Sequence, residues 1–122
     1  MLTDPYQQYK NTQVGTASPA RLLIMLFNGA IKLTKEAARE AERNNGAKVN
    51  TCLGKTQDIV AELMASLDLS QGDIAENLFQ LYRYMHERLV QANLNKDPEM
   101  IREVQGMLED LRDTWEAASQ AV

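Results

Sequence analysis

The chain has 122 residues, 44% of them hydrophobic, and its 17 acidic and 13 basic side chains give a net charge of −4. Such a chain can bury one core without disulfides or a structural metal, so we expect a single domain. The acidic balance argues against nucleic acid as a partner, because no surplus of positive charge attracts phosphates. The single Cys52 cannot form an internal disulfide, no secretory signal begins the chain and no apolar run could cross a bilayer. We therefore expect a cytoplasmic protein, located in the cytosol, that does not insert into a membrane.

The first half of the chain contains start and stop signals for two helices. Ser18 and Pro19 predict a helix start, since serine caps the first turn and proline suits the first helical position. This helix extends to about Asn44, where residues 44–46 (Asn-Asn-Gly) tolerate the positive φ that closes a helix. A second helix is expected from about Ala47 to Leu67.

The second half repeats the pattern. Residues 68–72 predict a turn, and the third helix ends near Asn95. Asp97, Pro98 and Glu99 then supply a cap, a first-position proline and an early acid for the fourth helix. Short connections force neighbouring helices to run antiparallel. The expected fold is all-α, an antiparallel up-down-up-down four-helix bundle over residues 18–122, preceded by an N-terminal leader over residues 1–17.

Apolar residues recur at helical spacing in each expected helix and predict its buried face. The stripes in chain order are Leu23, Leu26, Ala30, Thr34, Ala37 and Ala41; Val49, Leu53, Thr56, Val60, Leu63 and Leu67; Ile74, Leu78, Leu81, Tyr82, Met85, Leu89 and Ala92; and Ile101, Val104, Leu108, Leu111, Trp115 and Ala118.

The first helix carries more apolar surface than one core can receive. Residues 22–27 are six apolar side chains in a row, and a helix turns about 100° per residue, so they point all the way round it. Ile24 and Met25 fall outside the main stripe. Single exposed methionines are common on protein surfaces that bind nothing. Met25 by itself therefore does not indicate a binding site.

The third helix shows a similar surplus. Phe79, Arg83, His86 and Val90 lie at three- and four-residue spacing and form a second face beside the core stripe. Phe79 and Val90 are alternatively boundary residues covered by a neighbouring helix. Together with the aromatic side chains in the leader, the two surplus faces favour grooves that accept helices from another chain.

Catalytic chemistry finds no support in the sequence. The only histidine, His86, follows Arg83 and not a glutamate at the three-residue spacing of a di-iron bundle. Cys52 lies on a different expected helix from His86, and no glycine-rich phosphate loop occurs. We expect neither enzyme activity nor a cofactor or metal; a bundle enzyme or electron carrier is the least favoured alternative.

A set of short motifs is spread over nearly the whole chain. The motifs are residues 4–9 (DPYQQY), 16–19 (TASP), 23–30 (LIMLFNGA), 57–63 (QDIVAEL), 75–78 (AENL), 81–82 (LY), 84–85 (YM), Leu89, 92–93 (AN) and 111–115 (LRDTW). Together they resemble the motifs of the FliS family, the flagellin-specific export chaperones. The chain departs from the family at Ala20 and Arg21, where acidic residues commonly follow the proline.

The resemblance implies a cytoplasmic helical bundle that binds the C-terminal region of flagellin, prevents its premature polymerisation and supports its secretion. It also assigns the leader with Tyr6 and Tyr9 to client binding; whether the leader is a short helix or an extended strap stays open. We hypothesise that the leader covers a surplus face until flagellin displaces it. The alternative is a regulatory or structural adaptor that docks other flagellar cytoplasmic proteins. The candidate partner-binding residues are Tyr6, Tyr9, Ile24, Met25, Phe79, Arg83 and Val90.

Overall fold

The computed structural model describes residues 18–120, which form four long α-helices and one short 3₁₀ helix. The predicted leader lies outside the described residues. No strand occurs between residues 18 and 120, so the all-α fold class is confirmed. The elements are α2 (Pro19–Glu42), α3 (Gly46–Ala65), η1 (Leu69–Gln71), α4 (Asp73–Asn95) and α5 (Pro98–Gln120).

Side-chain caps explain where three of the helices begin. The Ser18 hydroxyl oxygen accepts a hydrogen bond from the backbone N–H of Arg21 at 3.2 Å, and Pro19 occupies the first turn of α2. The Asn45 side chain caps α3 in the same way, and the Asp97 carboxylate accepts from the backbone N–H of Glu99 at 2.9 Å. Each cap satisfies N–H groups that have no partner inside the helix.

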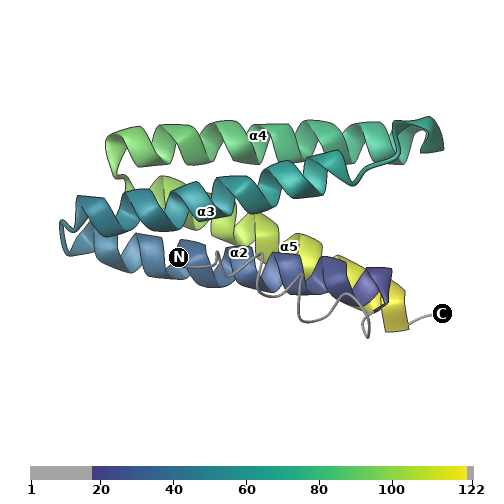
Figure 1. Cartoon of the computed structure of the whole chain (residues 1–122), viewed down its shortest axis with the longest axis horizontal. Helices are drawn as coiled ribbons and strands as arrows, with labels where there is room; N and C mark the ends of the chain where they lie inside the picture. Colours follow the sequence, from purple (N-terminus) through teal and green to yellow (C-terminus); the bar gives the residue numbers. More distant parts are fainter. Residues whose placement is uncertain (1–17, 121–122) are drawn as a thin grey trace, which may run out of the picture.

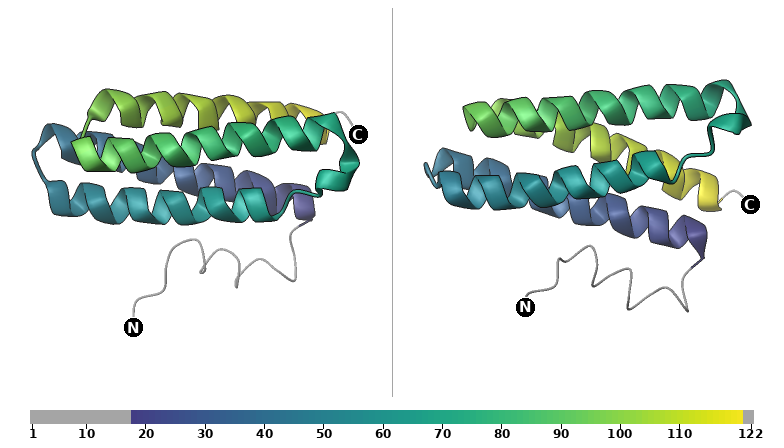
Figure 2. Two further views of the ribbon diagram at one scale, coloured as in Figure 1. Left: turned by 90° about the horizontal axis from the view of Figure 1, so that it is seen from above. Right: turned by 45° about the horizontal axis from the view of Figure 1, so that its top comes forward.

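The four helices form a ring in which each packs against two neighbours. The packed pairs are α2 with α3, α3 with α4, α4 with α5, and α5 with α2. Figure 1 shows α2 and α4 running in one direction and α3 and α5 in the other, and the two views of Figure 2 agree with this arrangement. The up-down-up-down bundle is therefore confirmed. Of the four, α4 makes the least extensive contacts with its neighbours.

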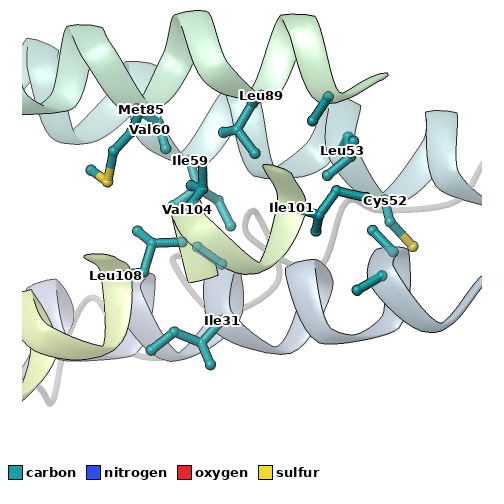
Figure 3. Close-up of a cluster of buried hydrophobic side chains, with 14 of the residues drawn as sticks. Ile31, Cys52, Leu53, Ile59, Val60, Met85, Leu89, Ile101, Val104 and Leu108 are labelled. Atoms are coloured by element: carbon teal, nitrogen blue, oxygen red, sulfur yellow. The ribbon is translucent and has the colours of Figure 1, made fainter. Parts of the chain in front are cut away.

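The core receives buried side chains from all four helices. Figure 3 shows Ile31, Leu53, Leu89 and Val104, one from each helix, in the same buried cluster. Buried Thr34 and Thr56 leave no hydroxyl unpaired, because each donates a hydrogen bond to a backbone carbonyl one turn earlier.

The buried arc of α2 is wider than its stripe predicts. Phe27, Ile31 and Ala38 are buried in addition to most of the predicted positions. The reason is that α2 packs extensively against both α3 and α5, so two sides of this helix are covered. The ring of Phe27 packs against that of Tyr82, with centroids 6.5 Å apart.

Two stripe positions were wrongly assigned to the core. Ile74 is 76% exposed and Ala118 is also exposed. Ile74 lies in the first turn of α4, which projects past the end of α3 in Figure 1, and Ala118 lies in the last turns of α5. Helical periodicity continues to the end of a helix, but the neighbouring helix that would cover it does not.

None of the helices between residues 18 and 120 is both long enough and apolar enough to cross a membrane.

Ile74 and Ile101 offer a matched test of this core. Ile101 is fully buried on α5, whereas Ile74 is mostly exposed. We expect Ile101→Ala to lower the free energy of unfolding by about 2–5 kcal/mol, because it removes buried methyl groups and leaves a cavity. Ile74→Ala should change it by less than about 0.5 kcal/mol. Urea denaturation of the two variants measures both values, and similar losses would contradict the assigned core.

Candidate protein-binding grooves

The apolar run over residues 22–27 lies in the first three turns of α2, and only Phe27 is fully buried. The other five side chains are partly exposed. The prediction that this run exceeds what the core can receive is therefore confirmed. Ile24 and Met25 both keep exposed surface, and they line different hollows on the two sides of α2.

Met25 lines a groove between α2 and α3 with a volume of about 310 Å³, which we call the α2/α3 groove. Its lining is mostly apolar in surface and comes from successive turns of both helices. From α2 it takes Met25, Leu26, Gly29, Lys32, Leu33 and Glu36, and from α3 Lys48, Thr51, Cys52, Lys55 and Ile59. A groove of this kind can seat apolar side chains of a second helix or an extended segment.

Basic side chains gather at this groove although the whole chain is acidic. Lys32, Lys48 and Lys55 line it together with one acid, Glu36. The Lys48 ammonium lies 3.4 Å from the Glu36 carboxylate, and both side chains are partly exposed. Two more ammonium groups than carboxylates therefore surround an apolar floor, which suits a ligand that combines apolar side chains with carboxylates.

Cys52 contributes to this groove from α3, but only 3% of the residue is exposed. Burial, with a smaller contribution from the Glu36 carboxylate, raises the pKa of its thiol above the ordinary value. The thiol is thus protonated at neutral pH and is a poor nucleophile. It behaves as a small apolar side chain, and no cluster of three or more His, Cys, Asp or Glu side chains suited to a metal occurs among residues 18–120.

Ile24 lies at the opposite side of α2, in an open hollow that it shares with the end of α5. The other lining residues are polar or charged: Ser18, Arg21, Glu116 and Ser119. The structure therefore does not bring Ile24 and Met25 into one site, although they are adjacent in sequence.

Three predicted residues lie on α4. Phe79 is partly buried, Arg83 is exposed and Val90 is 38% exposed. Arg83 forms an ion pair with Glu87 one turn later, with Nε and Oε1 3.3 Å apart. Val90 and His86 border a shallow hollow on the outside of this helix. His86 and Cys52 thus line separate hollows, and nothing couples them as a catalytic pair.

Sequence reasoning missed Leu94, which is 72% exposed on α4. It follows Val90 by four residues and so continues the same side of the helix. The spacing is visible in the sequence, but Leu94 lies beside the expected helix end near Asn95, where periodicity does not tell whether a neighbouring helix covers a side chain. Tyr6 and Tyr9 lie outside the described residues.

A network of polar side chains connects α4 to α5. The Tyr84 hydroxyl donates to the Glu103 carboxylate at 2.6 Å, and the Arg88 guanidinium donates to the same carboxylate at 2.7 and 2.9 Å. These hydrogen bonds, that of Tyr84 first, lower the pKa of Glu103, and the bond to Glu103 raises the pKa of Tyr84. The network therefore links α4 to α5 in addition to their core packing.

A four-helix bundle with an apolar, lysine-lined groove and no catalytic constellation among its described residues fits the class of protein-binding bundles. The comparisons with known proteins identify its family. The model of the family described as "Flagellar protein FliS" matches residues 2–122. The chain belongs to the FliS family.

Curated relatives agree along nearly the whole chain. The flagellar secretion chaperone FliS of Bacillus subtilis is 37% identical over 120 residues, which cover 98% of this chain and 90% of that protein. The corresponding protein of Salmonella typhimurium is 39% identical over 108 residues, covering 87% of this chain and 80% of that protein. FliSB of Pseudomonas aeruginosa is 34% identical over 116 residues, covering 93% of this chain and 92% of that protein. These names describe chaperones, which confirms that the chain is not an enzyme.

The buried thiol gives a test of the α2/α3 groove. In the folded protein, we expect Cys52 to react with a chromogenic disulfide reagent at least about tenfold more slowly than in the urea-unfolded chain, since burial limits access and raises its pKa. The release of the coloured thiol at neutral pH measures both rates. Equal rates would show that the groove is open down to the thiol.

Proposed function

We propose that this protein is a cytosolic flagellar export chaperone that binds the C-terminal segment of flagellin, keeps it from polymerising prematurely and supports its secretion. The observation that carries this proposal is the α2/α3 groove with Met25 in its lining, in a chain that belongs to the FliS family. The groove supplies apolar surface that the bundle's own core does not use.

The chemistry of the groove suits an amphipathic client segment. Met25 and Leu33 offer apolar contacts, and methionine adapts its shape to varied partners. The ammonium groups of Lys32 and Lys55 can form ion pairs with carboxylates that flank the client's apolar side chains. If the client is unfolded before binding, the loss of its conformational entropy offsets part of the interaction free energy. A large contact area then gives only moderate affinity.

The proposed contact residues lie on different sides of the bundle. Ile24 lies in the hollow beside α5, Met25 lines the α2/α3 groove, and Phe79, Arg83 and Val90 lie on α4. One straight helix cannot reach all three places. A client that uses them all must therefore wrap around the bundle as a chain with flexible joints, which an unfolded segment allows.

Tyr6 and Tyr9 complete the proposed contact set on the strength of the family resemblance alone. In our hypothesis the leader over residues 1–17 is a self-ligand that occupies an apolar groove and leaves it when flagellin binds. Hydrogen exchange of residues 1–17 with and without client tests this displacement, which unchanged protection would contradict.

Truncation of the client separates the chaperone from the alternative, an adaptor that docks other flagellar cytoplasmic proteins. We expect full-length flagellin to bind in calorimetric titration, and flagellin that lacks its last few dozen residues to lose at least about tenfold in affinity, which is about 1.4 kcal/mol. A peptide of the removed residues should bind by itself. Unchanged binding of the truncated flagellin would favour the adaptor.

Met25→Asp tests the groove itself. A carboxylate beside the apolar floor should weaken binding of the C-terminal flagellin peptide at least about tenfold. Because Met25 is only partly buried, the variant should still unfold cooperatively in urea. The matched control is Ala61→Asp, an exposed position on α3 that does not line the groove, and its affinity should equal that of the wild type. If both variants bind the peptide like the wild type, the client does not use this groove.

A further inference from the structure

A row of polar and basic residues lies on the outward side of α2. Asn28, Lys32, Lys35 and Arg39 follow one another at steps of four and three residues, so they share one side of the helix, and all four are exposed. Arg112 of α5 joins the row, because its guanidinium donates a hydrogen bond to the Asn28 side-chain oxygen at 3.1 Å. We call these five residues the α2 ridge.

The ridge lines a hollow between α2 and α5, two helices that pack side by side (Figure 1). The hollow has a volume of about 430 Å³. Four basic side chains and one acid, Glu36, line it, although the whole chain has 17 acidic and 13 basic side chains. The Glu36 carboxylate lies 3.4 Å from the Lys48 ammonium of α3. The single acid of the hollow is therefore already paired with a base from outside it.

The cations of the ridge are only partly neutralised by this chain. Lys35 lies 3.8 Å from the Glu109 carboxylate, and Arg112 pairs with the acid that follows it in α5. Neither Lys32 nor Arg39 takes part in an ion pair within residues 18–120. Two exposed positive charges on one side of α2 are therefore left for an anion from another molecule.

The stability of α2 does not account for this row. A base in the last turn favours the negative end of the helix dipole, which explains Arg39. Lys32 and Lys35 lie about two to three turns before the helix end, where the dipole has little effect. Like charges three and four residues apart repel each other, so the row lowers the stability of the helix. A binding role explains why the bases lie together.

We propose that the α2 ridge binds an acidic helix of a partner protein, one that carries carboxylates every three or four residues along one side. Lys32 and Arg39 are seven residues apart, which is about 10 Å along α2. A helix that lies along the ridge repeats this spacing and brings a carboxylate opposite each cation. The planar guanidinium of Arg39 can hold a carboxylate through two parallel hydrogen bonds.

Shape and charge distinguish this partner from other anions. The ridge lines a hollow between two helices, so a flat anionic membrane would meet only its rim. A nucleic acid is a long polyanion, and the net negative charge of the chain would repel the parts of it that lie beyond the ridge. The leader over residues 1–17 has one acidic and one basic side chain, so charge gives it no preference for the ridge.

The inference does not rest on the proposed function, because an acidic helix of any origin should bind. The hollow shares Lys32 and Glu36 with the α2/α3 groove, and its other lining residues lie outside that groove. Exposed ion pairs contribute little each and are screened by salt. Binding is therefore weak and depends on the salt concentration.

A fluorescein-labelled peptide supplies the probe. It is alanine-rich, about 20 residues long and helical by circular dichroism, with glutamates at steps of four and three residues along one side. We expect its fluorescence anisotropy to rise to saturation when the full-length chain is added at low salt, and to rise much less at about 0.15 M salt. The same peptide with glutamine in place of every glutamate should not bind.

Charge reversal locates the contact. Arg39→Glu should lower the association constant of the acidic peptide at least about fivefold, and Lys32→Glu should do the same. The matched control is Arg83→Glu, which makes the same charge change at an exposed arginine of α4. It should change the association constant by less than about twofold. All three variants should keep native helix content in circular dichroism, because the replaced side chains are exposed.

Three results would overturn the proposal. The first is an acidic peptide that shows no saturable binding at low salt. The second is an equal loss of affinity in Arg39→Glu and Arg83→Glu, because overall charge would then explain the binding. The third is displacement of the labelled peptide by phosphatidylglycerol vesicles or single-stranded RNA at a lower concentration of negative charge than the unlabelled peptide requires. That result would assign the ridge to a membrane or to a nucleic acid.

Discussion

The structure depends on a limit to how much of one helix its neighbours can cover. Between α3 and α5, α2 buries a wide arc that includes Phe27, Ile31 and Ala38. Even so, the six apolar residues at 22–27 point all the way round the helix, and only the last of them is fully buried. The bundle is therefore stable through its shared core and still carries apolar surface that the core leaves unused.

That surplus has a definite place in the molecule. On one side of α2 it joins apolar side chains of α3 in a groove lined by Lys32, Lys48 and Lys55. Because the groove lies between two packed helices, its walls are held by the same contacts that form the core, and binding there does not require the bundle to unfold. In the proposed function, the bundle supplies a preformed groove, and the unfolded client adapts its shape to that groove.

The surface of α4 differs in origin. Its exposed apolar residues arise because α4 packs less extensively against its neighbours than the other three helices do. It is tied to α5 by the Tyr84, Arg88 and Glu103 network and to α3 by a hydrogen bond between Asn93 and Asn50.

The sequence by itself determined the four helices, their antiparallel order and the family, because caps such as Ser18 and Asp97 act locally and apolar periodicity reports the buried side of each helix. It also predicted that residues 22–27 exceed the core. Only the tertiary structure decided that Ile24 and Met25 line separate hollows, that Lys32 meets Lys48 and Lys55 at one groove, and that Ile74 lies past the end of the core. The physical reason is that periodicity gives angles around a helix's own axis. It does not say which neighbour lies at each angle, or where that neighbour ends.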